Sequence, residues 1–598
     1  MTVKTREIAK FKSVKVIQPF NYCGVQLRKS MFQEQFNQMK RYYLAISNDD
    51  ILKGFREQAG LSAPGKNLGG WYSGEIPCSS KVKKRPPLAF NVTFGQWLGA
   101  FARMYRVTGE AVILRKLEYL LKERGKTMQA GGYFFYGTSP TGGHYGFDKL
   151  VGGLVDTYEY VGEEKSIKYL RKITDWAINN LSRRRIPATP DTSDGGSSID
   201  GKSRDIEWYT LAENFYRAYV LTGDPVYRDF AKIWHYESYW SDLRENKHSM
   251  TGLHAYSHIN TLSSAAMAYA VSGDTSYLNT IMNAYEILQK TQVFATGGYG
   301  PKERMANQYG SLGNSLYFEG ETFENPCGTW AAFKLARYLM MFTGKAIYGD
   351  WIETLLYNGI GAALPMAEEG KTYYYCDYKV SGGEKKYYAE AFPCCSGTYP
   401  LTVTDYHNII YFKDKNSLYV NIFIPSQVKW NKSGHTINLI QDTDFPKTER
   451  VSLKIGISGS TEFSLKFRIP AWVRRSVSVK LNSKPFSGKW KPGDWGEIHR
   501  MWNDGDIVDI EFPLDLYFLP ADNYHPNLVA LMYGPTVLVA DKGGVLQGDK
   551  EHPSSWIAPT SDQPLVFQTR GEMNKREFGP YFKYGKGERY YMYHEIEK

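Results

Sequence analysis

The sequence predicts a multidomain α+β protein in which an (α/α)6 barrel is followed by one or two β-sandwich domains. Between about residues 25 and 365, apolar residues recur at helical spacing. After about residue 405, apolar and polar residues alternate and turns become frequent, as expected for strands. A chain of 598 residues is also too long for one hydrophobic core, so two or three domains are expected.

The helical half contains a recurring helix end. An aromatic or apolar segment reaches a glycine, and a new amphipathic helix begins just after it. Glycine readily adopts the left-handed conformation in which many helices end. The five instances are Gly109, Gly162, Gly223, Gly273 and Gly344. This repeat predicts stacked helical hairpins, which form either an open solenoid or a closed ring. The long glycine-rich inserts favour a closed barrel of six pairs.

The domain boundaries follow from the change of pattern. Residues 1–20 include a short β-like stretch at 13–17 that we expect to pack on the sandwich, and residues 21–405 are assigned to the barrel. The rest is assigned to a β-sandwich over 406–520 and a further sandwich portion over 521–598. Strands are predicted near residues 417–425, 462–470, 507–513, 535–540 and 588–594.

Composition limits the classes of partner. The formal net charge of +11 favours an anionic partner such as a sulfated polysaccharide, and no basic run resembles a nucleic-acid-binding arm. The 46 tyrosines and 14 tryptophans suit stacking against sugar rings, or a large aromatic core.

The sequence contains no apolar run of about 18 residues, so no membrane span is expected. The N-terminus lacks a signal-peptide core, which predicts a cytoplasmic protein, or a periplasmic one if a leader was trimmed. A homodimer is compatible with the large sandwich.

Three of the six cysteines lie in two short segments that suggest a metal site. Cys394 and Cys395 are adjacent, and Cys327 follows Glu324 by three residues. Adjacent cysteines rarely form a disulfide with each other, because that bond needs Cα atoms roughly 4.4–6.8 Å apart in a specific geometry. Three thiolates and one carboxylate can form a tetrahedral zinc shell. Buried, inert thiols are the alternative, but the flanking Pro and Gly residues favour Zn²⁺.

A glycine-rich loop at 296–303 precedes the helix that Cys327 enters. Its Glu303 has two interpretations, a general acid/base or a solvated loop residue. His254 and His258 are four residues apart, which suits a metal pair, two donors to a sugar, or ordinary core residues. His144 stands in a glycine-rich stretch before Asp148.

The order of these motifs along the chain resembles glycoside hydrolase family 127, the β-L-arabinofuranosidase-like enzymes. The resemblance extends over nearly the whole chain, and PCCxG together with ExPC is its most specific part. Members are (α/α)6 barrels with β-sandwich domains, and they are retaining exo-glycosidases with a zinc ion and a cysteine nucleophile. The matching motifs are GFR (54–56), GGW (69–71), HAYSHIN (254–260), GGYGPxE (297–303), FExPCG (323–328), FKLAR (333–337), LYNG (356–359), YYY (373–375) and PCCSGT (393–398).

The resemblance implies roles for individual residues. Cys394 is the implied nucleophile, and Glu303 is the implied acid/base. The implied zinc ligands are Glu324, Cys327, Cys394 and Cys395, and the implied substrate contacts are His144, His254, His258 and Tyr374. The best-known members have Glu-x-Cys where this chain has Glu-x-x-Cys, which leaves Glu324 or Glu321 as the ligand, and we prefer Glu324. The family histidine expected before Asp148 is poorly matched, which leaves the sugar open.

Several functions are compatible with these motifs. The family default is release of a terminal β-L-arabinofuranose from plant or algal glycans. A 3,6-anhydro-D-galactosidase acting on carrageenan oligosaccharides is the second candidate, favoured by the basic charge and the altered Glu-x-x-Cys motif. A polysaccharide lyase that uses Tyr and His, and a non-catalytic glycan-binding protein with a structural zinc, are the alternatives from other classes.

Overall fold

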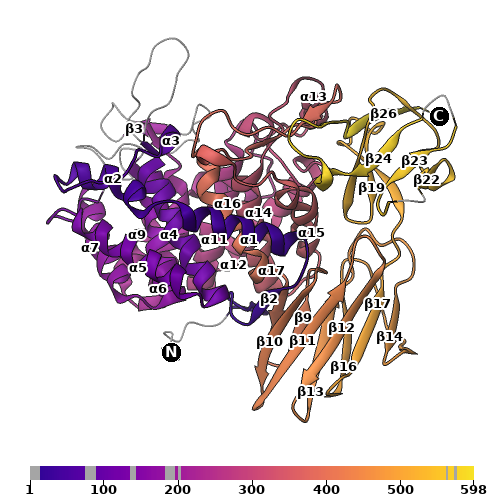
Figure 1. The fold of residues 1–598 in the computed structure, drawn as a ribbon, viewed down its shortest axis with the longest axis horizontal. Helices are drawn as coiled ribbons and strands as arrows, with labels where there is room; N and C mark the ends of the chain where they lie inside the picture. Colours follow the sequence, from indigo (N-terminus) through magenta and orange to yellow (C-terminus); the bar gives the residue numbers. More distant parts are fainter. Residues whose placement is uncertain are drawn as a thin grey trace.

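The computed structural model describes residues 14–73, 89–134, 143–181, 196–198, 204–560, 563–571 and 575–597. A large helical domain occupies one side of the molecule, and two β units lie on the other side (Figure 1). None of the described helices combines the length and apolar character that a membrane span requires.

The helical domain is a closed double ring. Its inner helices are α4 (Ala89–Thr108), α6 (Gly143–Val161), α8 (Ala212–Thr222), α11 (Ala255–Ser272), α14 (Asn325–Thr343) and α16 (Cys395–Thr404). Each contacts the next, and α16 returns to contact α4. In the same order, the outer helices are α5 (Ala111–Lys126), α7 (Glu164–Asn180), α9 (Pro225–Ile233), α12 (Thr275–Thr291), α15 (Tyr348–Asn358) and α1 (Met31–Ala45). The predicted (α/α)6 barrel is confirmed, and the open solenoid is wrong.

The five repeat glycines end five of the inner helices. Their φ angles lie between 68° and 81°, in the left-handed region. Each glycine N–H donates to the carbonyl four residues earlier, as in Gly273 to Tyr269 at 2.8 Å. Each then leads directly into the outer helix that packs on the helix just ended. The sixth pair differs, because α16 is covered by α1 from the start of the chain.

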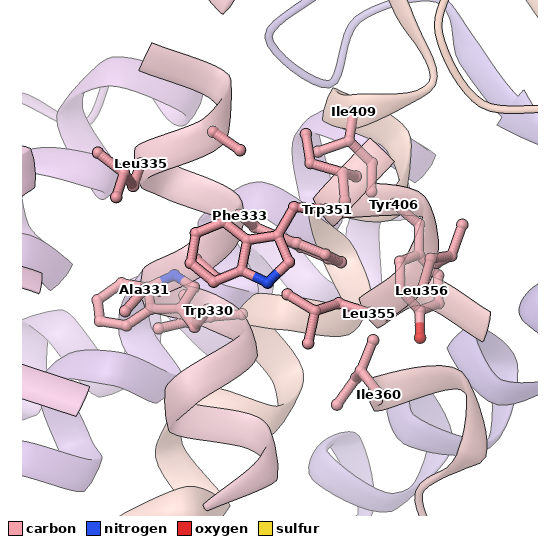
Figure 2. Packing of buried hydrophobic residues seen from close by; sticks show 14 of the residues in the cluster. Trp330, Ala331, Phe333, Leu335, Trp351, Leu355, Leu356, Ile360, Tyr406 and Ile409 are labelled. Atoms are coloured by element: carbon pink, nitrogen blue, oxygen red, sulfur yellow. The ribbon is translucent and has the colours of Figure 1, made fainter. Parts of the chain in front are cut away.

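A buried hydrophobic cluster holds α14 and α15 together beneath the glycine-rich loop. Phe333 of α14, Trp351 and Leu355 of α15, and Tyr406 of α17 (Tyr406–Ile409) belong to it, as Figure 2 shows. The Trp351 indole N–H donates to the carbonyl of Gly297 at 2.8 Å. This bond fixes the loop that carries Glu303 to the wall of the barrel.

The middle β unit is a sandwich of two sheets. One has the order β1 (Gln18–Pro19), β8 (Tyr411–Lys413), β9 (Ser417–Val420), β13 (Ser460–Arg468), β16 (Trp495–Asn503). The other has the order β15 (Lys484–Pro485), β14 (Ser478–Leu481), β17 (Ile507–Glu511), β12 (Arg450–Ile457), β11 (His435–Thr443), β10 (Ser426–Lys432), β2 (Val25–Leu27). The N-terminal segment therefore pairs with both sheets, through β1 and β2 rather than through residues 14–17, and this pairing continues past residue 20. Ser13, the first residue of the expected β-like stretch, lies outside the described residues.

The last β unit is a sheet with its own small core. Its order is β21 (Leu546–Gln547), β26 (Tyr593–Glu597), β19 (Leu528–Tyr533), β20 (Thr536–Ala540), β24 (Glu577–Pro580), β23 (Phe567–Thr569), β22 (Ile557–Pro559), and β18 (Leu516–Pro520) also pairs with β19. Along β19, Val529 and Leu531 enter this small core, while Ala530 and Met532 join the main core. Because successive side chains point to opposite faces, β19 connects both cores.

Candidate active site

Two neighbouring inner helices begin at the cysteine motifs. Glu324 ends the short strand β5 (Phe323–Glu324), and Cys327 lies in the first turn of α14. Pro326 suits this position, because backbone N–H groups in the first turn of a helix have no acceptor within the helix. The N–H that proline lacks is therefore not needed here. Cys394 immediately precedes α16, and Cys395 is its first residue. Since α14 and α16 contact each other, the two motifs meet at one end of the barrel.

The four predicted metal ligands form one compact group. The Cys327 and Cys395 Sγ atoms are 3.4 Å apart, and the Cys327 and Cys394 Sγ atoms are 3.8 Å apart. Glu324 Oε1 lies 3.4 Å from Cys394 Sγ and 3.5 Å from Cys395 Sγ. One ligand atom from each residue lies within 4.8 Å of the others. Glu321, the alternative ligand, is not a member of this group.

The electrostatics of the group suit a cation. The Cys327 and Cys395 thiols donate to Cys394, and these hydrogen bonds hold the pKa of Cys394 well below its usual range. Burial raises the pKa of the Cys327 and Cys395 thiols and of the Glu324 carboxyl. Glu324 Oε2 is buried and has no hydrogen-bond partner in the described part of the chain. Three sulfurs and a carboxylate oxygen are a donor set that zinc accepts, so the residues fit the expected ion.

Glu303 lies beside this group, at the end of a strained loop. The backbone of Lys302 and Glu303 is left-handed, with φ of 53° and 58°. Such conformations cost about 1–3 kcal/mol in residues other than glycine and are frequent at functional sites. Glu303 accepts hydrogen bonds from His254 Nε2 at 3.1 Å, from the Tyr374 hydroxyl at 3.1 Å, and from the Tyr375 hydroxyl. Burial raises the pKa of Glu303, but these bonds outweigh it and lower the pKa overall.

Tyr374 connects the two halves of the site. It lies next to β6 (Tyr375–Cys376), the strand that pairs with β5, and this pairing sets Tyr375 opposite Glu324. The Tyr374 hydroxyl is 3.1 Å from Cys394 Sγ as well as 3.1 Å from Glu303 Oε1. The expected nucleophile and the expected acid/base therefore flank one hydroxyl group.

The three predicted histidines occupy different positions. His254 precedes α11, and its Nδ1 accepts from the Ser257 amide while Nε2 faces Glu303. His258 is buried one turn further, and its Nδ1 donates to the His254 carbonyl at 2.8 Å. Burial lowers the pKa of His258 to about 3, so this ring is neutral. His144 is a fully buried residue of α6 whose ring packs against Trp234. The structure brings only His254 into contact with the predicted catalytic residues.

Glu207 is a site residue that the sequence interpretation missed. It is 5% exposed, has a left-handed φ of 59°, and places Oε1 3.4 Å from His254 Nδ1. Its Oε2 is buried without a hydrogen-bond partner among the described residues, and burial raises its pKa to about 7. No motif surrounds Glu207 in the sequence. Its backbone conformation and its carboxylate near His254 are visible only in the folded chain.

Comparison with known proteins agrees with this geometry. A family model described as the GH127 catalytic domain of β-L-arabinofuranosidase matches residues 24–408, and its middle-domain counterpart matches residues 417–514. The non-reducing end β-L-arabinofuranosidase of Bifidobacterium longum subsp. longum is 25% identical over 297 residues, which cover 45% of this chain and 43% of that protein. The aligned region therefore spans less than half of that relative.

Solved structures share the complete fold. A GH127 β-arabinofuranosidase superposes with a TM-score of 0.72 at 16% identity, covering 98% of both chains. A GH127 β-L-arabinofuranosidase from Geobacillus stearothermophilus T6 gives a TM-score of 0.70 at 16% identity, covering 96% of this chain and 100% of that one. These similarities concern the fold, whereas the family models match the sequence itself. The chain belongs to glycoside hydrolase family 127, and it carries both the catalytic and the middle domain of that family.

Proposed function

We propose that this protein is a retaining exo-glycosidase that releases terminal β-L-arabinofuranose. The observation that carries the proposal is the pair formed by Cys394 and Glu303 on either side of the Tyr374 hydroxyl. A double-displacement mechanism requires a nucleophile and an acid/base close together in one site. The name of the Bifidobacterium relative, a non-reducing end β-L-arabinofuranosidase, supports this choice of sugar.

The proposed reaction has two steps. The Cys394 thiolate attacks the anomeric carbon and forms a C–S bond, while the glycosidic C–O bond breaks and the departing oxygen takes the Glu303 proton. This step requires Glu303 to be protonated in the substrate complex, although its hydrogen bonds lower its pKa in the free site. The Glu303 carboxylate then accepts a proton from water, whose oxygen attacks the same carbon and breaks the C–S bond. The sugar leaves with its original anomeric configuration, and Glu303 is protonated again.

We also propose that Glu324, Cys327, Cys394 and Cys395 hold Zn²⁺. The compact donor set and the unsatisfied Glu324 oxygen support this. A bound cation stabilises thiolate at neutral pH and orders the ligands around it.

Tyr374 and His254 are the proposed sugar contacts, since both already contact Glu303. We propose that His144 and His258 hold neighbouring side chains of the site in place rather than contact the sugar. Both are buried, and neither has a described contact with Glu303 or the cysteines.

Metal analysis combined with activity assays tests this function. We expect about one zinc per chain in the wild type, and activity on arabinofuranosyl substrates that is lost in Cys394→Ser. Cys376→Ser is the matched control, because Cys376 is a buried free cysteine outside the ligand group. It should retain both zinc and activity. Full activity of Cys394→Ser would overturn the nucleophile assignment, and an ultraviolet-absorbing unsaturated product would indicate a lyase. A glycan that binds without turnover would indicate a non-catalytic protein.

The basic charge supports one further substrate class. With a net charge of +11, the protein favours anionic glycans, and the family resemblance includes 3,6-anhydro-D-galactosidases. Carrageenan oligosaccharides therefore belong in the same substrate panel. Turnover of these, with none of arabinofuranosides, would establish the second candidate.

A further inference from the structure

Glu207 is a buried carboxylate at the end of the barrel that carries the four proposed zinc ligands, here called the Cys/Glu group. It immediately precedes the short 3-10 helix Trp208–Thr210, which contacts α6 and α11 and leads into α8. Burial raises the pKa of Glu207, and the negative charge of Cys394 adds to this effect. Burial also raises the pKa of the Tyr145 hydroxyl, and the charges of Glu207 and Cys394 raise it further. Glu207 is therefore close enough to the proposed nucleophile to interact with it, yet the proposed reaction gives it no role.

His254 connects Glu207 to the proposed acid/base. Its Nδ1 lies 3.4 Å from Glu207 Oε1, and its Nε2 lies 3.1 Å from Glu303 Oε2. The imidazole ring thus stands between two carboxylates, of which the proposed reaction uses one. The hydroxyl and the amide of Ser257 lie 2.9 Å and 3.4 Å from the same Nδ1, and the amide donates to it. A ring nitrogen that accepts a hydrogen bond does not also donate one, so this contact leaves Glu207 Oε1 without a donor.

The other carboxylate oxygen of Glu207 also lacks a donor. The residue is only 5% exposed, and its Oε2 is buried with no hydrogen-bond partner among the residues that the structure describes. Lys149 is near enough to lower the pKa of Glu207 slightly against the larger effect of burial. However, the Lys149 Nζ already pairs with Asp148 Oδ2 at 2.7 Å. The result is a carboxyl group with a pKa of about 7, as expected for one that is buried and poorly compensated.

The backbone of Glu207 is strained as well. Its φ angle of 59° lies in the left-handed region, which residues other than glycine seldom adopt. A strained backbone and an unpaired buried carboxylate each lower stability, and features of this kind concentrate where a ligand is bound. Carboxylate oxygens accept hydrogen bonds, so the partner that completes Glu207 is a donor. In a site beside Cys394 and Glu303, the donors that a glycan brings are its hydroxyl groups.

We propose that Glu207 determines substrate specificity by accepting hydrogen bonds from free hydroxyl groups of the terminal sugar. The inference rests on the proposed function, because it assumes that this sugar reacts beside Cys394 and Glu303. An arabinofuranosyl group carries three free hydroxyls, at C2, C3 and C5. In 3,6-anhydro-D-galactose the oxygens at C3 and C6 form an ether and cannot donate. A sulfate on the sugar would meet the like charges of Glu207 and Glu303. The site thus favours an uncharged sugar with free hydroxyls, although the whole chain has a net charge of +11.

Kinetics on deoxy sugars tests the proposal. The substrates are p-nitrophenyl β-L-arabinofuranoside and its analogues that lack the hydroxyl at C2, C3 or C5. In the wild type, kcat/KM should fall about 10- to 100-fold for at least one analogue, because a hydrogen bond to a charged group is lost. Glu207→Leu should show a similar loss on the parent substrate and little further loss on that analogue. This non-additivity identifies the hydroxyl that Glu207 contacts. Glu207→Gln keeps an acceptor without its charge and should give an intermediate loss.

A second buried glutamate of the barrel provides the matched control. Glu213 is 4% exposed, but its carboxylate accepts hydrogen bonds from Lys334 and, at 3.0 Å, from the Tyr338 hydroxyl. Glu213→Gln should lower the melting temperature and leave the wild-type discrimination between parent and deoxy substrates unchanged. Glu207→Gln should instead raise the melting temperature at pH 8 while it lowers kcat/KM. A carboxylate with a merely structural role would not separate stability from activity in this way.

The possible outcomes separate this inference from the proposed function. Turnover of the arabinofuranoside without coupling between Glu207 and any hydroxyl would overturn the inference and leave the function intact. If the arabinofuranoside is not turned over, the proposed function fails, and the same variants are compared on the neutral glycoside that is hydrolysed. Coupling to a hydroxyl of that sugar would support the inference. Turnover of only a sulfated or anhydro sugar, or of no member of the panel, would overturn both.

Discussion

Cys394 Sγ lies 3.1 Å from the hydroxyl oxygen of Tyr374. That hydroxyl also donates to Glu303 Oε1 at 3.1 Å. Tyr374 is 3% exposed, and its ring packs on the ring of Tyr388 with centroids 4.6 Å apart. The hydroxyl is therefore held in place before a substrate enters, and it sets the spacing between the two proposed catalytic groups.

Removing this hydroxyl should impair catalysis while leaving the fold intact. We expect Tyr374→Phe to lower kcat/KM by about 10- to 100-fold, because orientation of both Cys394 and Glu303 is lost. Steady-state kinetics on an arabinofuranosyl substrate measures this. Tyr373→Phe is the matched control, since Tyr373 is equally buried but its hydroxyl contacts Tyr581 at 2.9 Å. Equal losses in both variants would show that Tyr374 acts only through packing.

The identity of the carboxylate ligand can be tested with a pair of glutamates. Glu324→Gln should lower zinc affinity by an order of magnitude or more, because an amide oxygen carries no charge to offset the cation. Glu321→Gln should bind zinc as the wild type does, since Glu321 lies outside the Cys/Glu group. Competition with a colorimetric chelator measures both affinities. The reverse result would make Glu321 the ligand.

Most of the barrel was predictable because its signals are local. In five pairs, the inner helix, its glycine and its outer helix follow one another in the chain. The sixth pair joins α16 to α1, which lies more than 300 residues earlier. Every residue of α16 is buried, so it has no polar face and no amphipathic period that sequence reading can detect. Its partner could be identified only from the folded chain.

In the site, too, the residues that belong to local sequence motifs were predictable. Cys394, Cys395, Cys327 and Glu324 stand in two short motifs, and residues that share one metal ion must be close in space whatever separates them in sequence. His144, by contrast, stands next to glycines, which suggested a loop. It is instead in α6 and faces the core, because helical rotation rather than neighbouring composition decides where a side chain points.

Glu207 gives the site a measurable pH dependence. Burial raises its pKa from about 4.5 to about 7, so the folded chain binds more protons than the unfolded chain in this interval. Stability therefore falls as pH rises from about 4.5 to 7, and the loss persists above 7. We expect Glu207→Gln to stabilise the protein by on the order of 3 kcal/mol at pH 8 and by little at pH 4.5. Urea unfolding at both pH values measures the difference.

An exposed glutamate provides the control for this prediction. Glu286 on α12 is 58% exposed in its side chain, and Glu286→Gln should change stability by less than about 1 kcal/mol at either pH. If Glu207→Gln changed stability equally at pH 4.5 and pH 8, burial of its charge would not be the cause.

One buried carboxylate connects the two ends of the helical ring. Asp405 follows α16 directly, is fully buried, and accepts from Arg103 of α4 at 3.0 Å and from the Tyr22 hydroxyl. It thus links the last inner helix to the first one and to the N-terminal segment. Asp405→Asn should destabilise the protein by about 3–5 kcal/mol, because it leaves a buried arginine partly uncompensated.

The matched control is an exposed ion pair on the outer ring. Arg171 and Asp175 of α7 are 2.8 Å apart with about half of each side chain exposed, so Asp175→Asn should cost less than about 1 kcal/mol. Thermal unfolding of both variants at the same zinc concentration measures the two costs. A similar small loss in Asp405→Asn would mean that hydrophobic contacts between α4 and α16, rather than this ion pair, close the ring.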